Sequence, residues 1–209
     1  MALLDRRQAL ALLGTAALHP LSMAQGAARA FGGADFPPSM LVGGQTLVLN
    51  GAGIRYKAMF QVYAAALYLE QLSTTAESAL QPKGCKRLAA TMLRTVNANE
   101  LANLFTKGIL DNNPSQVTTQ ILPSLARMSA VFSRYKTLNT GDQFMVDRLP
   151  GKGMVLTVRG EPQHEPFDEA FFDAMLNIWL GPRAADPALK QALLGSDPYL
   201  NRPALASSS

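Results

Sequence analysis

The sequence contains very few residues that form crosslinks or bind metals. Cys85 is the only cysteine among 209 residues, which excludes an internal disulfide and a cysteine-based metal site. Histidine is almost as rare, with only His19 and His164. One thiol and two imidazoles do not supply the usual ligand set of a structural zinc ion. The sequence therefore predicts a fold held together by its hydrophobic core, with no metal site.

Charged residues are also scarce, at 16% of the chain, and the two signs nearly balance. The residues after position 30 carry 16 basic and 14 acidic side chains, because three arginines and one aspartate precede them. A nucleic-acid surface needs lysines and arginines gathered on one face. The one short cluster, Lys83, Lys86 and Arg87, is typical of solvated loop surface. We therefore expect no nucleic-acid partner.

The apolar run at the N-terminus is too short to span a membrane. Residues 9–18 form a run of about ten, whereas a bilayer core needs about 20. Two arginines at 6–7 precede the run and small residues follow it, which is the order of a secretory signal and resembles a twin-arginine signal. We expect residues 1–30 to be an export signal cleaved after Ala24 or Ala30. The protein would then be periplasmic or secreted, without a stable membrane anchor.

The rest of the chain has the size of one domain. With 48% hydrophobic residues in the whole chain, a sizeable core can be buried. We predict that this domain covers residues 31–195 and that the Pro- and Ser-containing residues 196–209 form a loose tail. The sequence does not indicate the oligomeric state.

The first half of the domain has the alternation of β-strands. The glycines at 43–44 precede a short strand that ends at Asn50-Gly51, a pair typical of a hairpin turn. Residues 54–69 then have the pattern of one long extended stretch, with one face apolar throughout and the other turning from polar to apolar midway. Three more strands are expected over residues 87–96, 143–149 and 154–159, the last two joined by a turn at 150–153.

The second half has helical spacing. Asn97 followed by Glu100 is typical of a helix start, and Pro123 should kink or split a later helix. The expected helices cover residues 97–108, 117–135, 167–180 and 186–194. Hairpin strands followed by gathered helices indicate an α+β fold, a large antiparallel sheet backed by a helical layer.

Several motifs resemble those of the bacterial chalcone isomerase-like proteins. They are Leu-Asn-Gly-Ala-Gly-Ile-Arg-Tyr at 49–56, Val-Tyr-Ala-Ala-Ala-Leu-Tyr-Leu-Glu at 62–70, Gly-Asp at 141–142, Pro-Gly-Lys-Gly at 150–153, Ile-Trp-Leu-Gly at 178–181 and Leu-Lys-Gln-Ala-Leu-Leu-Gly at 189–195. Together they cover roughly residues 36–195. The resemblance implies an open-faced sandwich with a ligand cleft between the antiparallel sheet and the helical layer.

Plant chalcone isomerases of this fold cyclise a chalcone into a flavanone with an arginine, two threonines and a tyrosine. By resemblance, Arg55 matches the arginine, while the threonine positions fall on Tyr63 and Ile178. No tyrosine between Tyr68 and Tyr135 supplies the helical hydroxyl. Ring closure needs groups that polarise the ketone as the enolate forms, and most of them are missing. We therefore expect no authentic chalcone isomerase activity, and an isomerase or lyase acting on another enone is kept as an alternative.

The resemblance also implies a site for an apolar molecule with an anionic end, such as a fatty acid. Non-catalytic relatives of this fold bind fatty acids through an arginine and a tyrosine, here Arg55 and Tyr63. An arginine fork suits a carboxylate, and Met59 with Phe60 is expected to line the tail channel. Such a protein requires no cofactor. On a straight strand, however, Arg55 and Tyr63 would lie about 26 Å apart. An internal ion pair of Arg55 with an acidic residue is the alternative.

A haem-like tetrapyrrole is a second ligand class. Its propionates would also bind Arg55, and His164 or Tyr63 could ligate the iron. His164, however, lies in the polar segment 161–166, where a histidine is usually solvated. Trp179 continues an apolar helical stripe and is expected in the core. A haem-binding or haem-modifying role is therefore a further alternative.

Overall fold

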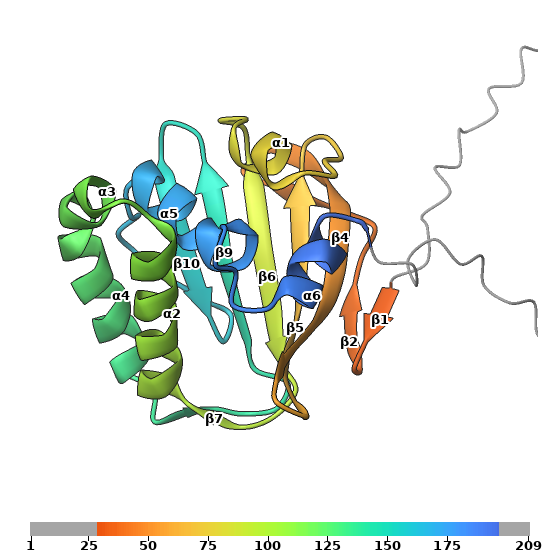
Figure 1. Cartoon of the computed structure of the whole chain (residues 1–209), viewed down its shortest axis with the longest axis horizontal. Helices are drawn as coiled ribbons and strands as arrows, with labels where there is room; N and C mark the ends of the chain where they lie inside the picture. The colour runs from red at the N-terminus through yellow and green to blue at the C-terminus, as the bar shows by residue number, and fades with distance from the viewer. Residues whose placement is uncertain (1–28, 197–209) are drawn as a thin grey trace, which may run out of the picture.

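The computed structural model describes residues 29–196. They form the predicted α+β fold, in which a seven-stranded antiparallel sheet is covered on one face by helices (Figure 1). The strand order in this sheet is β11-β10-β9-β6-β5-β4-β3. Most of the expected export signal and nearly all of the expected tail lie outside the described residues.

The elements follow the predicted division into a strand-rich first half and a helix-rich second half. The seven strands of the main sheet are β3 (Ser39–Val42), β4 (Gln45–Lys57), β5 (Phe60–Leu69), β6 (Lys86–Met92), β9 (Gln143–Leu149), β10 (Gly153–Val158) and β11 (Glu161–Pro162). Two small sheets pair β1 (Arg29–Phe31) with β2 (Ala34–Phe36) and β7 (Val96–Asn97) with β8 (Thr137–Leu138). The helices are α1 (Ala76–Leu80), α2 (Ala98–Asn112), α3 (Ser115–Gln120), α4 (Leu122–Ser133), α5 (Glu169–Leu180) and α6 (Pro187–Leu193).

The stretch predicted as one strand over residues 54–69 is a hairpin of two strands. β4 ends at Lys57, β5 begins at Phe60, and the two pair antiparallel. Ala58 in the turn has a φ of 53°, in the left-handed region that glycine usually occupies. Because alanine carries no turn signal, the sequence pattern does not reveal this reversal.

The prediction of a hairpin turn at Asn50-Gly51 was wrong, because both residues lie inside β4. The pairing of β4 with β5 shifts register at this point. The buried Asn50 amide donates to the carbonyl oxygens of Ser73, at 2.9 Å, and Leu193, at 2.7 Å. A Cβ at Gly51 would collide with the carbonyl oxygen of Ala192. The two residues therefore hold α6 against the sheet.

The side chains of β5 alternate between two hydrophobic cores. The odd-numbered residues from Tyr63 to Leu69 belong to the main core, which the helices share. The even-numbered residues Ala64, Ala66 and Tyr68 face the opposite side and pack with Phe36 of β2 in a smaller core. The predicted burial of this strand on both faces is confirmed, and residues of β2 help to cover the face away from the helices. Figure 1 shows β1 and β2 beside β4.

The predicted helix signals are confirmed with one change. Asn97 caps α2, since its side-chain oxygen accepts from the backbone N–H groups of Asn99 and Glu100 at 2.9 and 3.1 Å. Pro123 lies in the first turn of α4, and the predicted split separates α3 from α4. However, α2 continues past Gly108 to Asn112. None of the helices in the described part of the chain is long and apolar enough to cross a membrane.

Candidate ligand-binding site

Arg55 and Tyr63 are directly opposite one another in the β4–β5 hairpin. Their side chains leave the same face of the sheet, and opposite residues of an antiparallel pair have Cβ atoms only about 5 Å apart. The separation of about 26 Å predicted for a straight strand does not apply, because the chain reverses between the two residues. The hairpin thus brings together the two residues that the resemblance implied.

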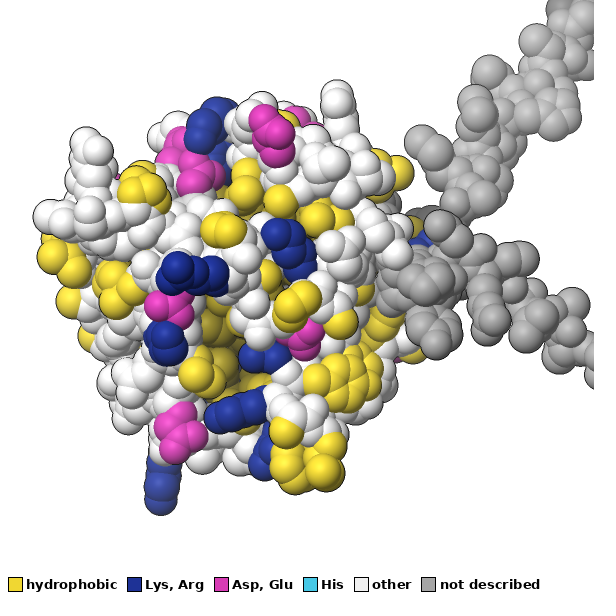
Figure 2. Space-filling view, viewed as in Figure 1, with side chains coloured by type: hydrophobic (Ala, Val, Ile, Leu, Met, Phe, Trp, Pro, Cys, Tyr) yellow, Lys and Arg dark blue, Asp and Glu magenta, His cyan; other side chains and the backbone are white. Residues whose placement is uncertain are grey.

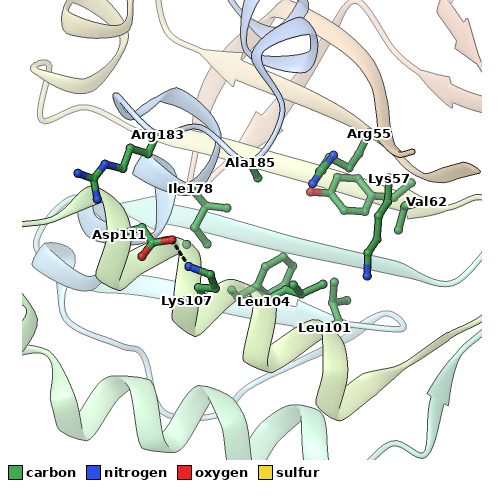
Figure 3. Close-up of a pocket in the computed structure, with 13 residues that line it drawn as sticks. Arg55, Lys57, Val62, Leu101, Leu104, Lys107, Asp111, Ile178, Arg183 and Ala185 are labelled. Atoms are coloured by element: carbon green, nitrogen blue, oxygen red, sulfur yellow. Dashed lines mark hydrogen bonds and ion pairs between the residues drawn. The ribbon is translucent and has the colours of Figure 1, made fainter. Parts of the chain in front are cut away.

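Both side chains line a slot of about 200 Å³ between this hairpin, α2 and the end of α5 (Figure 3). Its apolar wall consists of Val62, Leu101, Leu104, Phe105, Gly108, Ile178 and Ala185. Its polar residues, besides Tyr63, are Arg55, Lys57, Lys107, Asp111 and Arg183. The space-filling view shows a hydrophobic hollow bordered by basic side chains (Figure 2). The slot is therefore apolar inside and mainly cationic at its rim.

The hydroxyl of Tyr63 is fixed by Trp179, whose indole N–H donates to it at 2.9 Å. Burial raises the pKa of Tyr63 to about 12, although the hydrogen bond from Trp179 opposes this. The phenol is therefore neutral at physiological pH and keeps its proton. Its oxygen already accepts from the indole, and no acceptor for its own proton is found among the residues described. Tyr63 can therefore donate this proton to an oxygen of a ligand.

Among the residues that the structure describes, Arg55 has one acidic neighbour, Asp186. Its Nη1 lies 3.4 Å from Oδ2 of Asp186 and also donates to the carbonyl oxygen of Tyr56. The same carboxylate accepts from the backbone N–H groups of Tyr56, Ala188 and Leu189, so it is shared with the N-terminus of α6. Among the hydrogen bonds found within residues 29–196, Arg55 donates only through Nη1, while its guanidinium lies close enough to Tyr63 to oppose the rise in the pKa of that phenol. The internal ion pair thus exists, but it engages only one edge of the guanidinium.

Met59 does not line the slot, which corrects the expected tail channel. The β4–β5 turn leaves 83% of Met59 and 56% of Phe60 exposed, and neither is part of the wall. The wall comes instead from α2, through Leu101, Leu104 and Phe105. These side chains share one helical face by their spacing of three and four, the signal that identifies them in the sequence.

The positions that the resemblance related to catalysis do converge on this slot. Arg55, Tyr63 and Ile178 all line it, and the α2 wall opposite them carries leucine and phenylalanine. Among its lining residues, Tyr63 alone has a hydroxyl group. Trp179 is 1% exposed, so its predicted core position is confirmed, but its hydrogen bond to Tyr63 was not foreseen.

His164 lies away from this slot. It is exposed and lines a separate hollow with Arg127, Arg134 and Phe167, none of which borders the slot. In the part of the chain that the structure describes, no three His, Cys, Asp or Glu side chains are grouped so as to hold a metal ion. His164 and Arg55 therefore do not belong to one site.

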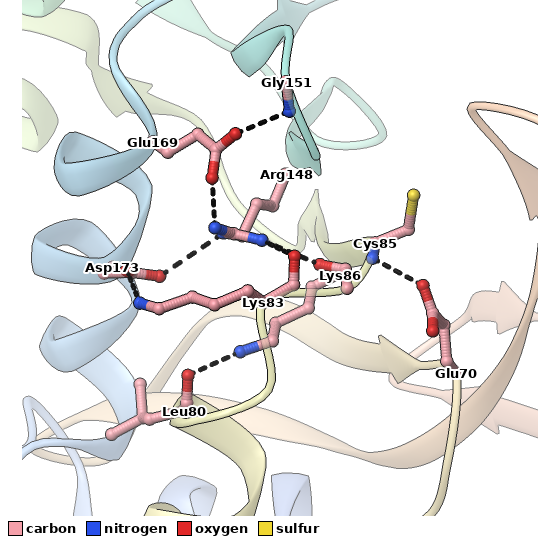
Figure 4. A network of polar contacts seen from close by, with 10 residues as sticks. Glu70, Leu80, Lys83, Cys85, Lys86, Arg148, Gly151, Glu169 and Asp173 are labelled. Atoms are coloured by element: carbon pink, nitrogen blue, oxygen red, sulfur yellow. Dashed lines mark hydrogen bonds and ion pairs between the residues drawn. The ribbon is translucent and has the colours of Figure 1, made fainter.

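A second polar cluster lies near α1 and the start of α5 (Figure 4). Arg148 is 2% exposed and contacts Glu169 and the carbonyl oxygen of Lys83. Lys86, also 2% exposed, donates to the carbonyl oxygen of Leu80 at 2.7 Å, and burial lowers its pKa to about 8. Each cation has a partner within the fold, which favours a structural role.

The expectation that Lys83, Lys86 and Arg87 form a solvated loop surface was wrong for two of the three residues. Lys86 is buried, and Arg87 forms a two-armed pair with Asp147, with Nε 2.6 Å and Nη2 2.5 Å from its oxygens. Only Lys83 is well exposed, at 70% of its side chain. A hollow of about 340 Å³ adjoins this region, but Glu70 at its edge already accepts from the backbone N–H of Cys85 at 2.6 Å. Its charged groups are therefore occupied by the protein itself.

The antiparallel sheet, its helical layer and the slot lined by Arg55 define an α+β domain with an apolar slot between sheet and helices. A family model described as chalcone isomerase-like matches residues 28–195, and the chain belongs to this family. The fold is similar to the crystal structure of an Arabidopsis thaliana fatty-acid binding protein, AtFAP1, with a TM-score of 0.58, 14% identity, and coverage of 78% of this chain and 92% of that one. At this identity the likeness establishes the fold. No curated protein sequence matches the chain.

Proposed function

We propose that the protein binds a fatty acid or a similar apolar anion in the slot. The observation that carries this proposal is the cross-strand pairing of Arg55 and Tyr63 at the head of an apolar wall. The free edge of the Arg55 guanidinium and the proton of Tyr63 would both donate to a carboxylate. Hydrogen bonds to a charged group contribute about 1.5–3 kcal/mol each. The solved structure of similar fold, described as a fatty-acid binding protein, supports this ligand class.

The size of the slot predicts how affinity depends on chain length. About 200 Å³ is below the ~300–1,000 Å³ of typical small-molecule pockets, so the slot encloses a short acyl segment. Each buried methylene contributes about 0.8 kcal/mol, or roughly fourfold in affinity. Calorimetry with a series of saturated fatty acids should show this increase until the slot is filled, and a plateau beyond it. A flat response over the whole series would contradict binding in the slot.

The direct test of the head group is Arg55→Met, which keeps the apolar stem and removes the charge. We expect at least a tenfold loss of fatty-acid affinity, about 1.4 kcal/mol or more, because one charge-assisted contact is lost. Arg159→Met is the matched control, since Arg159 pairs with Asp142 and does not line the slot. Unchanged affinity in Arg55→Met would refute the proposed site.

The natural ligand can be identified by extracting the purified protein and analysing the extract by mass spectrometry. A bound fatty acid would support the proposal. A Soret band after expression with added haem, or turnover of a chalcone-type enone, would instead favour the other functions considered from the sequence.

We also propose that the protein is exported, with cleavage after Ala24. Residues 29–31 form β1, in which Ala30 pairs with Asp35 of β2. Cleavage after Ala30 would remove two of the three residues of this strand, whereas cleavage after Ala24 keeps it whole. N-terminal sequencing of the protein from a periplasmic fraction tests this, and an uncleaved cytoplasmic chain would contradict it.

A further inference from the structure

The tip of the β4–β5 hairpin carries apolar side chains that the fold leaves exposed. Met59 is 83% exposed, Phe60 56% and Tyr56 41%, while Leu104 on α2 is 51% exposed. Leu104 also lines the slot, and the tip lies at the end of the sheet where β7 runs (Figure 1). Apolar side chains gathered beside a ligand opening are typical of an interaction surface. We call these four residues the hairpin-tip face.

A groove connects this face with the slot. The groove has a volume of about 220 Å³ and shares Lys57, Val62, Leu101 and Leu104 with the slot. Arg94 lines the groove, and its guanidinium lies over the Phe60 ring, 5.0 Å from the ring centroid. The slot, the groove and the hairpin-tip face therefore form one continuous surface.

This surface carries an excess of positive charge. Five basic residues line the slot and groove, Arg55, Lys57, Arg94, Lys107 and Arg183, against two acidic ones, Glu100 and Asp111. Lys107 pairs with Asp111 at 2.6 Å, and Arg55 contacts Asp186. Within the described range, Lys57, Arg94 and Arg183 have no carboxylate within 4.0 Å. Basic side chains thus border the hydrophobic hollow (Figure 2).

We propose that the hairpin-tip face docks on a bilayer that contains anionic lipids. Met59 and Phe60 would insert at the level of the acyl chains, and Lys57 and Arg94, which line the groove beside the tip, would lie against the phosphates. Exposed apolar side chains combined with lysine and arginine are the two contributions that peripheral membrane binding requires. The slot would then open onto the membrane, the source of an acyl ligand. This inference rests on the proposed function, which it extends by a route of ligand entry.

Vesicle flotation with the full chain tests the docking surface. Phosphatidylcholine vesicles are compared with vesicles that also contain phosphatidylglycerol, at low and high salt. We expect binding only to the anionic vesicles, weakened by salt. The double change Lys57→Glu with Arg94→Glu should weaken binding at least about 25-fold, because each basic residue near the surface contributes about a factor of five.

The apolar part is tested by Met59→Ser with Phe60→Ser, for which we expect a loss of at least about tenfold. Leu72→Ser is the matched control, because Leu72 is 70% exposed but follows β5 at the opposite end of that strand. The proposal is overturned if the variant with Met59→Ser and Phe60→Ser binds vesicles as tightly as the wild type does. It is also overturned if the wild type binds both vesicle types equally. A lipid-free dimer that the double variant abolishes overturns it as well, since a second copy would then cover this face.

Failure of the docking proposal and failure of the proposed function give different results. The Met59 and Phe60 variant should keep its affinity for monomeric fatty acid in solution, whereas Arg55→Met should lose that affinity and still bind vesicles. Vesicle binding by a wild-type protein that binds no fatty acid would leave the docking surface standing and refute the proposed function. If the wild-type protein binds fatty acid but does not bind anionic vesicles, the proposed function stands and the docking surface is refuted.

Discussion

The indole N–H of Trp179 on α5 donates to the phenolic oxygen of Tyr63 on β5, at 2.9 Å, inside the protein. This contact joins the helical layer to the sheet at the head of the slot. It also determines what Tyr63 can do, because an oxygen that already accepts one hydrogen bond can still donate its own proton. The orientation of the Tyr63 hydroxyl therefore depends on a residue that does not line the slot.

Tyr63→Phe should weaken both folding and ligand binding. The change leaves the buried indole N–H without a partner, which costs about 1–3 kcal/mol of unfolding free energy, and it removes one donor to the carboxylate. Chemical denaturation and fatty-acid titration measure the two effects. Tyr68→Phe is the control, since the Tyr68 hydroxyl donates to the carbonyl oxygen of Pro37 at 3.0 Å on the other side of the sheet. Tyr68→Phe should lower the unfolding free energy without changing fatty-acid affinity. A similar loss of affinity in both variants would contradict the role of Tyr63 as a donor to the ligand.

Asp186→Asn should increase the affinity for an anionic ligand. Asparagine still caps α6 through its side-chain oxygen, but its NH2 group replaces the oxygen that accepts from the Tyr56 N–H, so we expect a loss of about 1 kcal/mol in unfolding free energy. Removing the carboxylate frees Arg55 from a competing charge, worth about 1 kcal/mol for a partly exposed pair, or roughly fivefold in affinity. Asp142→Asn is the matched control, because Asp142 also accepts from a backbone N–H, at 2.8 Å from Asn139, and lies near Arg159. Weaker fatty-acid binding by Asp186→Asn would show that the aspartate itself contributes to the site.

Gly51→Ala should destabilise the fold by displacing α6. Its added Cβ would collide with the carbonyl oxygen of Ala192 and lie 2.7 Å from that of Leu193. Backbone atoms cannot move aside as a flexible side chain can, so we expect a loss above about 2 kcal/mol. Gly44→Ala is the comparison, since Gly44 has a φ of 86° with open space around it and carries only the conformational cost of about 1–2 kcal/mol. An equal or smaller loss at Gly51, measured by urea denaturation, would contradict this packing.

Because Lys86 is buried, we expect the free energy of unfolding to increase with pH above about pH 8. Its pKa is about 8 in the folded protein, where burial disfavours the charged amine, and about 10.4 when unfolded. Between these values the unfolded chain binds more protons, so the unfolding free energy should increase with pH by at most about 1.4 kcal/mol per pH unit. Urea denaturation between these two pH values measures the slope. Lys86→Met should flatten it and Lys83→Met should not, and a slope unchanged in Lys86→Met would place the titrating group elsewhere.

The sequence by itself determined the elements whose signals are local. Asn97 and Asp186 cap the helices that the pattern predicted, Pro123 separates α3 from α4, and the alternation in β5 matches its two cores. A cap, a proline or an alternating pattern acts over a few residues, so it can be interpreted without knowing the rest of the fold. The motifs were also sufficient to identify the chalcone isomerase-like family.

Only the tertiary structure decided how these elements meet. The turn at Ala58 lacks glycine, so the hairpin that pairs Arg55 with Tyr63 carried no signal. Asp186 reaches Arg55 across 131 positions, and Trp179 reaches Tyr63 across 116. Such contacts depend on strand register and on how helices pack, which are set by the whole core and not by neighbouring residues. Arg55 and Tyr63 could be singled out from the sequence, whereas Met59 was wrongly included and the contacts of Asp186 and Trp179 came only from the fold.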